Sequence, residues 1–414
     1  MIPQAPYRAV DTLFLWYLGR PERPILVGEL NLVSNARGVS LRYSNEWISA
    51  GFPLSEDLPL LDIEHLPREK DVAAGSVDDA RPDRWGERVI RQIERPPRLS
   101  LLEMLFFAGD DRFGALGVST SAERYLPRER GPLPTLGDID ALHELVRRVL
   151  AGEMIADEQS RRLIAPGATM GGARPKALID IGGIQWVVKF AEAGFQSEPM
   201  VEHASMTLAA KAGIVVAETR VIEFANGTAV AIKRFDRTPD GQRVHALSAN
   251  VALKAAGAEL SYPSLAQLLR RRGSSKKAVD HAQMRELFRR LIFNILIDNT
   301  DDHEKNHALL VTDSQHLLLS PAYDVLPTAQ ALGYQSMTVG NMGTVSSVEN
   351  ALSMSRSYGL DRASALVEAA HVAKVVNDWQ VHFAESAVDS NTIESLAAQI
   401  DRPFLLDQRK TLSK

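Results

Sequence analysis

A cluster of acids, amides and bases follows a long apolar segment, and its spacing suits metal-assisted phosphoryl transfer. The apolar run 287–297 ends in Asp298-Asn-Thr-Asp-Asp-His-Glu-Lys-Asn306. Asp301 and Asn306 are five residues apart, and Asp324 comes eighteen residues later. In phosphoryl transfer one carboxylate takes the proton of the attacking hydroxyl, while an amide oxygen and a second carboxylate hold Mg²⁺. The pattern therefore predicts a kinase.

The same segment also matches a zinc-peptidase pattern. His303-Glu-Lys-Asn-His307 fits H-E-x-x-H, in which two histidines one helical turn apart bind zinc and the glutamate acts as base. That arrangement needs a continuous helix through 303–307 and a third ligand downstream. Asp, Asn and Thr crowd residues 298–307 and compete for backbone hydrogen bonds, which favours turns over a helix interior. A zinc peptidase is therefore the less favoured alternative.

Composition limits the classes of protein that the chain can be. Its 414 residues are enough for two or three domains, and 45% apolar and 24% charged residues are typical of a globular protein. A net charge of −5 gives no general attraction to nucleic acid, and zero cysteines exclude disulfides, Cys-ligated zinc and iron–sulfur clusters. The N-terminus lacks a signal-peptide pattern, and no apolar run is long enough to span a membrane. We expect a cytoplasmic protein with no membrane partner.

The elements that must position the acidic cluster begin with a strand-rich part. Strand-like runs lie at 12–18, 25–32 and 39–43. Helical periodicity appears near 99–108 and again at 138–151, on either side of the linker-like Pro132-Leu-Pro-Thr135. These signals place a domain boundary near residues 130–150.

Residues 163–235 are predicted to form two hairpins around one helix. Two glycine-containing turns, at 182–183 and 226–227, separate strand-like runs at 177–181, 184–190, 219–224 and 228–234. The segment 198–212 is a helix candidate that Gly213 would end. From about residue 246 the chain is mostly helical in pattern. A β-rich part joined to a larger helical part predicts an α+β fold with the two-lobed layout of a kinase.

Three weak signals precede the acidic cluster in the order of kinase parts. The Gly-rich run 167–176 would let backbone N–H groups approach phosphates, although an ordinary loop has the same composition. Lys189, near the end of a strand, is either a partner for the ATP phosphates or a solvent-exposed edge lysine. Glu202, early on the next helix, either pairs with Lys189 or favours the helix N-terminus. Because His-Arg-Asp, Asp-Phe-Gly and Ala-Pro-Glu are absent, the kinase would be a divergent one.

Together these motifs resemble those of the HipA family, Ser/Thr protein kinases that act as toxins of bacterial toxin–antitoxin modules. Thr300-Asp-Asp-His-Glu-Lys-Asn306 resembles the family's T-D-x-H-x-K-N catalytic loop, and Tyr323-Asp-Val325 its Y-D-V metal-binding motif. Gly172-Ala-Arg-Pro-Lys176 is similar to the G-A-Q-P-K loop, with Arg in place of Gln. Lys233-Arg-Phe-Asp-Arg237 resembles E-R-F-D-R, and Pro82-Asp-Arg-Trp-Gly86 resembles P-D-x-W-G. The resemblance covers nearly the whole chain.

The resemblance implies where ATP and Mg²⁺ would bind. Asp301 would be the catalytic base, and Asn306 and Asp324 would bind Mg²⁺ beside the nucleotide. The other nucleotide contacts would come from the Gly-rich loop, the strand lysine with its helix glutamate, and backbone groups near the hinge; these residues are Thr169, Gly171, Gly172, Lys189, Glu202, Lys233 and Phe235.

The Gly-rich loop also implies a regulatory site. In the family a serine seven residues before the lysine of this loop is autophosphorylated, which expels the loop and silences the enzyme. Counting back from Lys176, the corresponding position is Thr169. Threonine keeps a hydroxyl, and a phosphate there would add roughly two negative charges beside those of ATP. We expect autophosphorylation at Thr169; the alternative is a loop hydroxyl that only positions phosphate.

Two further loop residues and one basic segment complete the candidates. Lys305 would stabilise charge on the transferring phosphoryl group, and His303 would orient the loop by hydrogen bonding. Arg270-Arg-Arg-Gly-Ser-Ser-Lys-Lys277 is the most basic run and is expected to be an exposed loop between helices. Its default role is a solvated surface, and the sharper alternative is contact with DNA or with an RNA-bound substrate.

The prediction is an ATP- and Mg²⁺-dependent Ser/Thr kinase of a HipA–HipB-type module. Its expected parts are residues 1–140 as an N-terminal subdomain, 141–240 as the kinase N-lobe and 241–414 as the helical C-lobe. Expected partners are a separate HipB-like antitoxin with a helix-turn-helix, operator DNA reached through it, and a protein substrate, with an aminoacyl-tRNA synthetase as the leading candidate. A pseudokinase acting as co-repressor is the alternative; the presence of all catalytic residues disfavours it.

Overall fold

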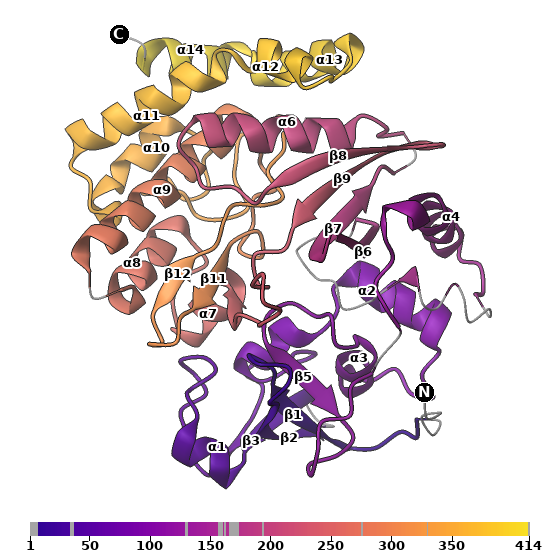
Figure 1. Cartoon of the computed structure of the whole chain (residues 1–414). Helices are drawn as coiled ribbons and strands as arrows, with labels where there is room; N and C mark the ends of the chain where they lie inside the picture. Colours follow the sequence, from indigo (N-terminus) through magenta and orange to yellow (C-terminus); the bar gives the residue numbers. More distant parts are fainter. Residues whose placement is uncertain are drawn as a thin grey trace. The chain divides into compact units, whose positions relative to one another are not determined.

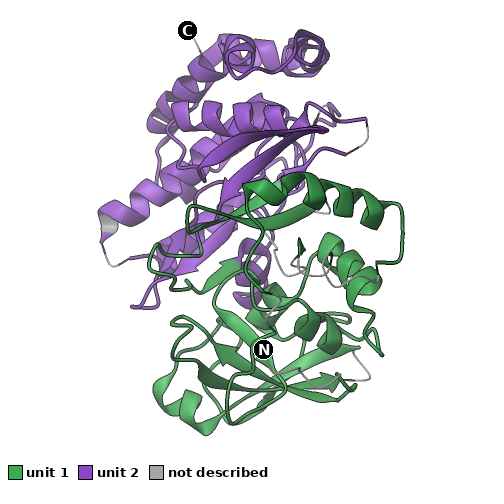
Figure 2. Cartoon of the chain, turned by 45° about the vertical axis from the view of Figure 1, so that its right-hand side comes forward, with its two compact units in different colours: residues 1–188, 236–247 green, residues 189–235, 248–414 purple. Residues whose placement is uncertain are grey.

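The protein is described by a computed structural model for residues 7–33, 37–128, 131–155, 160, 163–164, 174–192, 194–274, 276–328 and 330–412. The chain divides into two compact units (Figure 2). Unit 1 contains residues 1–188 and 236–247, and unit 2 contains residues 189–235 and 248–414. The three-part division at residues 140 and 240 stays a prediction, because compactness does not show which part binds nucleotide.

A five-stranded antiparallel sheet forms the first part of unit 1. In the order β4-β3-β2-β1-β5, its strands are Glu64–His65, Gly38–Tyr43, Ile25–Val33, Thr12–Tyr17 and Leu116–Ser119. Leu13 pairs with Leu30, which in turn pairs with Leu41, so apolar side chains share one face. These three leucines are buried with residues of α3 (Leu101–Phe107) in one hydrophobic core.

The rest of unit 1 contains α1 (Asn45–Ala50), α2 (Arg84–Val89), α4 (Ile139–Leu150) and the neighbouring strands β6 (Lys176–Ile181) and β7 (Ile184–Phe190). The turn between β6 and β7 contains Gly182 and Gly183 with φ of 65° and 81°, a left-handed conformation that glycine adopts at little cost. The indole N–H of Trp85 on α2 donates to the carbonyl of Lys176 at 2.8 Å, which fixes the start of β6. The last two residues of β7 belong to unit 2.

Unit 2 contains hairpins and most of the described helices. α6 (Glu198–Lys211) packs on the hairpin of β8 (Thr219–Phe224) and β9 (Gly227–Lys233), as Figure 1 shows. Gly213 follows the end of α6 with φ of 77°, which confirms the predicted helix stop. The remaining helices are α7 (Ala249–Ala255), α8 (Tyr262–Arg272), α9 (Lys277–Leu296), α10 (Val348–Ser353), α11 (Arg362–Val376), α12 (Trp379–Glu385), α13 (Ser390–Ile400) and α14 (Pro403–Leu412).

α9 delivers the acidic cluster. The last turns of α9 are buried, and Asp298 follows with a left-handed φ of 59°, so the chain leaves the helix sharply at this point. The loop then enters the hairpin of β11 (Ala308–Val311) and β12 (Leu317–Leu319). α11 packs against α9 and α14, whereas α12 packs against α6 and α13.

Sequence patterns predicted most of these elements, and the α+β class is confirmed. The basic run 270–277 differs in part from its expected loop structure, because its three arginines form the last turn of α8 and Lys277 begins α9. Arginine has a high helix propensity, and its charge is favoured near a helix C-terminus.

Candidate active site

A buried ion cluster in unit 2 joins three of the predicted site residues. Lys189 Nζ lies 2.7 Å from Glu202 Oε1 and 2.6 Å from Asp324 Oδ1. The side chains of Lys189, Glu202 and Asp324 are 6%, 2% and 13% exposed. Burial alone would lower the pKa of Lys189, but the charges of Asp324 and Glu202 raise the pKa above its ordinary value. The lysine is therefore charged and shared by two carboxylates.

The segment around Asp324 is tied to the catalytic loop and to the hinge candidate. Asp324 has a left-handed φ of 58°, a conformation that costs energy outside glycine and occurs often at functional sites. The hydroxyl of Tyr323 donates to the carbonyl of Lys305 at 2.8 Å. The rings of Tyr323 and Phe235 lie 5.4 Å apart, which brings Phe235 beside the Y-D-V segment.

The loop 301–306 holds four predicted catalytic or metal residues in one compact turn. Asn306 donates from its backbone N–H to His303 O at 2.8 Å and from Nδ2 to Asp301 O at 3.4 Å. His303 Nδ1 accepts from the backbone N–H of Lys305 at 3.3 Å, so the imidazole braces the turn. Asp301 and Lys305 are exposed, which leaves both side chains accessible to substrates.

Asn306 fits the predicted metal. Its Oδ1 is buried and accepts no hydrogen bond from any described residue. A buried amide oxygen without a donor is costly unless another group satisfies it, and Mg²⁺ prefers oxygen ligands. Asn306, Tyr323 and Val325 line one small cavity, so this oxygen belongs to the same region as the residues flanking Asp324. The residues present therefore suit Mg²⁺ held by Asn306 and Asp324.

Asp302 has a different environment from its neighbour Asp301. It is buried, and its Oδ2 accepts from the hydroxyl of Tyr262 and lies 2.8 Å from His307 Nε2. Burial alone would raise the pKa of Asp302, but His307 and Tyr262 hold the pKa below its ordinary value. Sequence reasoning missed this cluster, because nothing local distinguishes the two adjacent aspartates.

The same cluster removes support from the zinc alternative. His307 is buried against Asp302, so its Nε2 is already engaged. The residues 303–307 form a turn and not the helix that would align two histidines on one face. Within the described ranges, no three His, Asp or Glu side chains group as metal ligands.

A second network, which the sequence did not predict, holds the residues at the start of the loop. Asp298 is fully buried, and Arg402 Nη1 lies 2.8 Å from its Oδ1, an ion pair without hydrogen-bond geometry. The carbonyl of Asp298 accepts from the hydroxyl of Thr328 at 2.9 Å, and this hydroxyl lies 2.7 Å from that of Thr300. Arg402 comes just before α14, so no local pattern could have predicted its place beside the residue that begins the acidic cluster.

Four predicted nucleotide residues remain to be placed. Lys233 is half-buried; its backbone N–H donates to Glu218 O at 2.9 Å, and its Nζ donates to Glu218 Oε2 at 3.2 Å. Its backbone N–H is therefore already donated to Glu218 and is not open to the expected contact with adenine. Thr169, Gly171 and Gly172 lie outside the described residues.

Comparison with known proteins identifies two matching domain models. The HipA-like C-terminal domain matches residues 168–380, just over half of the chain, and the HipA N-terminal domain matches residues 24–119. In the part of the chain that is described, no helix is both long and apolar enough to cross a membrane.

Curated relatives carry kinase names. A protein of Sinorhizobium fredii named "Putative kinase Y4dM" is 30% identical over 256 residues, which cover 56% of this chain and only 56% of that protein. The serine/threonine-protein kinase toxin HipA of Shewanella oneidensis is 23% identical over 340 residues, 73% of each protein.

A solved structure supports the fold. The HipA chain in the complex of HipA, HipB and operator DNA from Shewanella oneidensis superposes with a TM-score of 0.65 at 19% identity, covering 96% of this chain and 97% of that one. At this identity the match shows the fold alone. Together with the domain models, it establishes that this chain belongs to the HipA family.

Proposed function

We propose that this protein is an ATP- and Mg²⁺-dependent Ser/Thr protein kinase that acts as the toxin of a HipA–HipB-like module. The observation that carries the proposal is the contact of Lys189 with both Glu202 and Asp324, residues from a strand, a helix and a distant loop. A strand lysine paired with a helix glutamate and placed beside a metal-binding aspartate is the arrangement that protein kinases need to hold ATP phosphates.

Each residue of the site has a role in the proposed transfer. Mg²⁺ held by Asn306 and Asp324 would offset the charge of the phosphates. Lys189 would hold the α- and β-phosphates, with Glu202 keeping its ammonium in place. Asp301, which is exposed at the start of the loop, would take the proton of the attacking hydroxyl. The exposed Lys305 would stabilise negative charge on the transferring group.

The nucleotide site extends the proposal beyond these contacts. Because the amide of Lys233 already donates to Glu218, we assign adenine recognition to the carbonyl of Lys233 and to the backbone at Phe235. The loop glycines Gly171 and Gly172 would approach the phosphates, and Thr169 would be the autophosphorylated residue. The functional parts would be 1–140, 141–240 and 241–414.

The proposed partners follow from the family. The solved relative forms a complex with HipB and operator DNA, so we propose a separate HipB-like antitoxin that links this chain to DNA. We propose a cytoplasmic, translation-related protein substrate, with an aminoacyl-tRNA synthetase as the first candidate. The co-repressor pseudokinase is the alternative, and the preserved contacts of Lys189 disfavour it.

Mass spectrometry of the purified chain with and without Mg-ATP tests the proposal. We expect phosphate on Thr169 in the wild type, and a loss of transfer of about 10²–10⁴-fold in Asp301→Asn, because the catalytic base is removed. Asp313→Asn is the matched control, since Asp313 is exposed in the turn between β11 and β12. Full transfer by Asp301→Asn would overturn the assignment of the base.

A further inference from the structure

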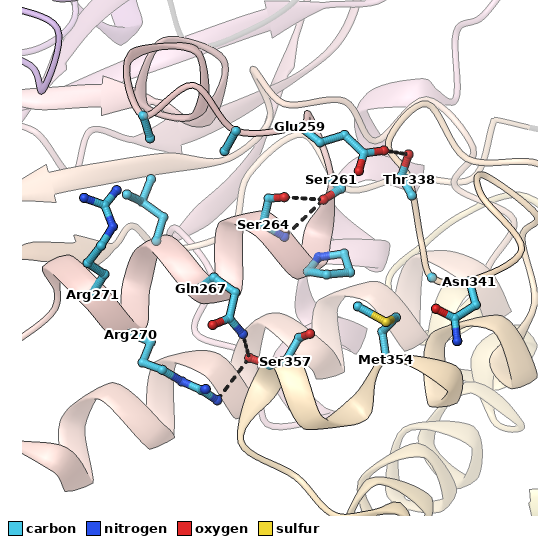
Figure 3. A pocket seen from close by; sticks show the side chains of 15 residues that line it. Glu259, Ser261, Ser264, Gln267, Arg270, Arg271, Thr338, Asn341, Met354 and Ser357 are labelled. Carbon is cyan, nitrogen blue, oxygen red and sulfur yellow. Dashed lines mark hydrogen bonds between the residues drawn. The ribbon is translucent and has the colours of Figure 1, made fainter.

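A polar groove in unit 2 lies apart from the residues assigned to ATP and Mg²⁺. Its volume is ≈680 Å³, within the range of about 300–1,000 Å³ that ligand sites occupy. Figure 3 shows α8 along one side and, opposite it, the loop at 338–341 and the residues after α10. Ser264, Gln267, Thr338, Asn341 and Ser357 are among the residues that line what we call the α8 groove.

Both sides of the α8 groove are attached to the catalytic loop. On one side, Tyr262 lies between the lining residues Ser261 and Pro263 and donates its hydroxyl to Asp302. On the other side, Ser336 is two residues before Thr338 and donates to the carbonyl of Thr300 at 3.2 Å. These contacts reach the two residues that flank Asp301, so the segments that form the groove also support the loop of the proposed base.

The lining chemistry suits an extended peptide. Four hydroxyl and two amide side chains are among its lining residues, and such groups can pair with the N–H and C=O of a bound main chain. Glu259 at the near end is engaged, because it accepts from the hydroxyl of Thr338 at 2.7 Å. The two cationic lining residues, Arg270 and Arg271, lie in the last turn of α8, and both are exposed.

Arg270 remains able to bind an anion. Its Nη2 donates to the carbonyls of Arg356 and Ser357 at 3.2 and 3.4 Å, and a guanidinium has five N–H donors. Arg271 follows Ser261 by ten residues, about 15 Å along α8. That length equals roughly four or five residues of extended chain.

We propose that the α8 groove binds the protein substrate, as an extended segment whose acidic side chains contact Arg270 and Arg271. This inference rests on the proposed kinase function and names a substrate class for it. A protein segment fits better than nucleic acid, since none of the described lining residues is aromatic and single-stranded nucleic acid is usually bound by stacking on aromatic rings. Arg270 and Arg271 thereby gain a role as specificity elements.

Binding and transfer measured on the same peptides test the proposal. The probes are two fluorescein-labelled pools of 15-residue peptides, each with one central serine and flanks that are rich in Asp and Glu or, in the matched pool, in Asn and Gln. We expect the wild type to bind the acidic pool about tenfold more tightly in fluorescence anisotropy, because two ion pairs are formed. Arg270→Glu/Arg271→Glu should lose this preference, whereas Lys374→Glu/Lys410→Glu, the same charge change at exposed sites on α11 and α14, should keep it.

A second variant tests the groove by size instead of charge. Gln267→Trp places a large side chain at an exposed position of the lining and should weaken binding of both pools while ATP binding is unchanged. Unaltered binding of both pools by this variant and by the arginine pair would overturn the groove as the peptide site.

The remaining outcomes separate this proposal from the kinase proposal. Phosphate transfer to both pools without an acidic preference would overturn the groove assignment and leave the kinase function standing. Acidic preference that depends on the arginines, without phosphate transfer to any peptide, would support binding of acidic peptides by the groove but overturn its role as the substrate site of a kinase. Tighter arginine-dependent binding of a 15-nucleotide RNA than of the acidic pool would overturn the peptide proposal in favour of nucleic acid.

Discussion

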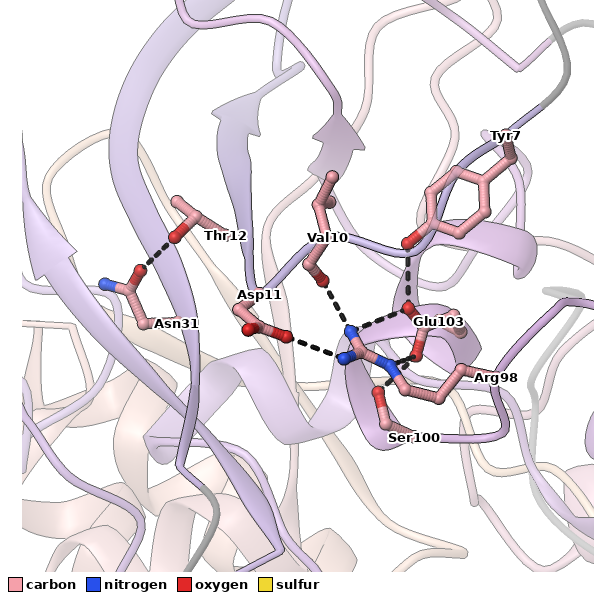
Figure 4. Close-up of polar contacts among 8 residues, drawn as sticks. All are labelled: Tyr7, Val10, Asp11, Thr12, Asn31, Arg98, Ser100 and Glu103. Atoms are coloured by element: carbon pink, nitrogen blue, oxygen red, sulfur yellow. Dashed lines mark hydrogen bonds and ion pairs between the residues drawn. The ribbon is translucent and has the colours of Figure 1, made fainter.

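Two charge clusters, one in each unit, contain the same types of charged group but differ in their exposure to water. In unit 1, Arg98 contacts Glu103 and Asp11 (Figure 4), and in unit 2, Lys189 contacts Glu202 and Asp324. Each cluster has one cation and two carboxylates. In unit 1 the second carboxylate, that of Asp11, is 77% exposed and is stabilised by water. In unit 2 Glu202 is buried, and the side chain of Asp324 is only 13% exposed.

The difference separates a cluster that holds a fold together from one that we propose takes part in ligand binding. The two oxygens of Glu103 accept from Arg98 at 2.9 and 3.0 Å, from Tyr7 at 2.9 Å and from Ser100, so the buried acid is fully satisfied. In the other cluster, Glu202 and Asp324 share one lysine and lie largely away from water. Carboxylate oxygens in such a place suit a divalent cation.

The largest expected effect is the loss of phosphate transfer when Asp324 is neutralised. In Asp324→Asn the proposed metal ligand is lost, and phosphate transfer should fall by more than about 100-fold because charge in the transition state is no longer stabilised. The melting temperature should change little, because asparagine keeps the shape of aspartate and tolerates the left-handed backbone conformation at this position. Radiolabelled transfer assays and thermal melts on one preparation measure both; unchanged transfer would contradict the metal role.

Neutralising Glu103 should have the opposite pattern. Glu103→Gln removes the buried partner of Arg98, and the free energy of unfolding should fall by about 2–3 kcal/mol, less than for a fully buried pair because Arg98 is partly exposed. Urea unfolding measures the change, and Glu22→Gln at an exposed site is the control. Loss of ATP binding in Glu103→Gln without loss of stability would show that the unit 1 cluster is not structural.

Arg402 offers an intermediate case, a charge that supports the site without touching the substrate. Arg402→Gln leaves the buried Asp298 without its cation, so the loop should hold Asp301 less accurately. We expect kcat to fall about tenfold with little change in KM for ATP. Arg362→Gln, which breaks an exposed pair with Glu349, should change neither constant. A rise in KM alone would contradict a positioning role.

The smallest expected effect is the loss of the stability contributed by Glu103 as the pH falls. Burial alone would raise the pKa of Glu103, but hydrogen bonds from Arg98, Ser100 and Tyr7 hold the pKa below its ordinary value. The stabilisation is therefore present above pH of about 4.3 and is lost as the pH falls through the lowered folded-state pKa. Urea midpoints between pH 5.5 and 3 should fall more steeply for the wild type than for Glu103→Gln. Parallel lines would contradict the assignment.

The lysine of the other cluster, Lys189, should not itself contribute in that range. Its raised pKa means that the stabilisation by Lys189 is fully present below the unfolded pKa of about 10.4 and is lost only as the pH rises through the folded-state pKa.

Local signals predicted the elements of the fold better than their contacts. Apolar periodicity and glycine turns are encoded within a few residues, so β8, β9 and α6 appeared close to their predicted bounds. The pairing of Lys189 with Glu202 was predicted from the order of kinase parts and is present in the structure.

The different roles of residues of the same type became clear only from their burial in the structure. Asp301 and Asp302 are identical neighbours, yet one is exposed and the other is buried against Tyr262 and His307. Tyr7 and Arg402 reach their partners across 96 and 104 residues of chain, and no pattern in a single sequence links such positions. Long-range packing therefore supplied the roles that residue type alone left open.

The ion pair between Arg402 and Asp298 also sets an order of events during synthesis. The residues that it joins are 104 positions apart, so at about 5–20 residues per second a ribosome adds the arginine roughly 5–20 s after the aspartate. During that interval the loop of Asp301 exists without its rear support. A chain still attached to the ribosome before Arg402 is added thus has an incompletely braced loop around Asp301, which would delay the onset of the proposed kinase activity until that residue is in place.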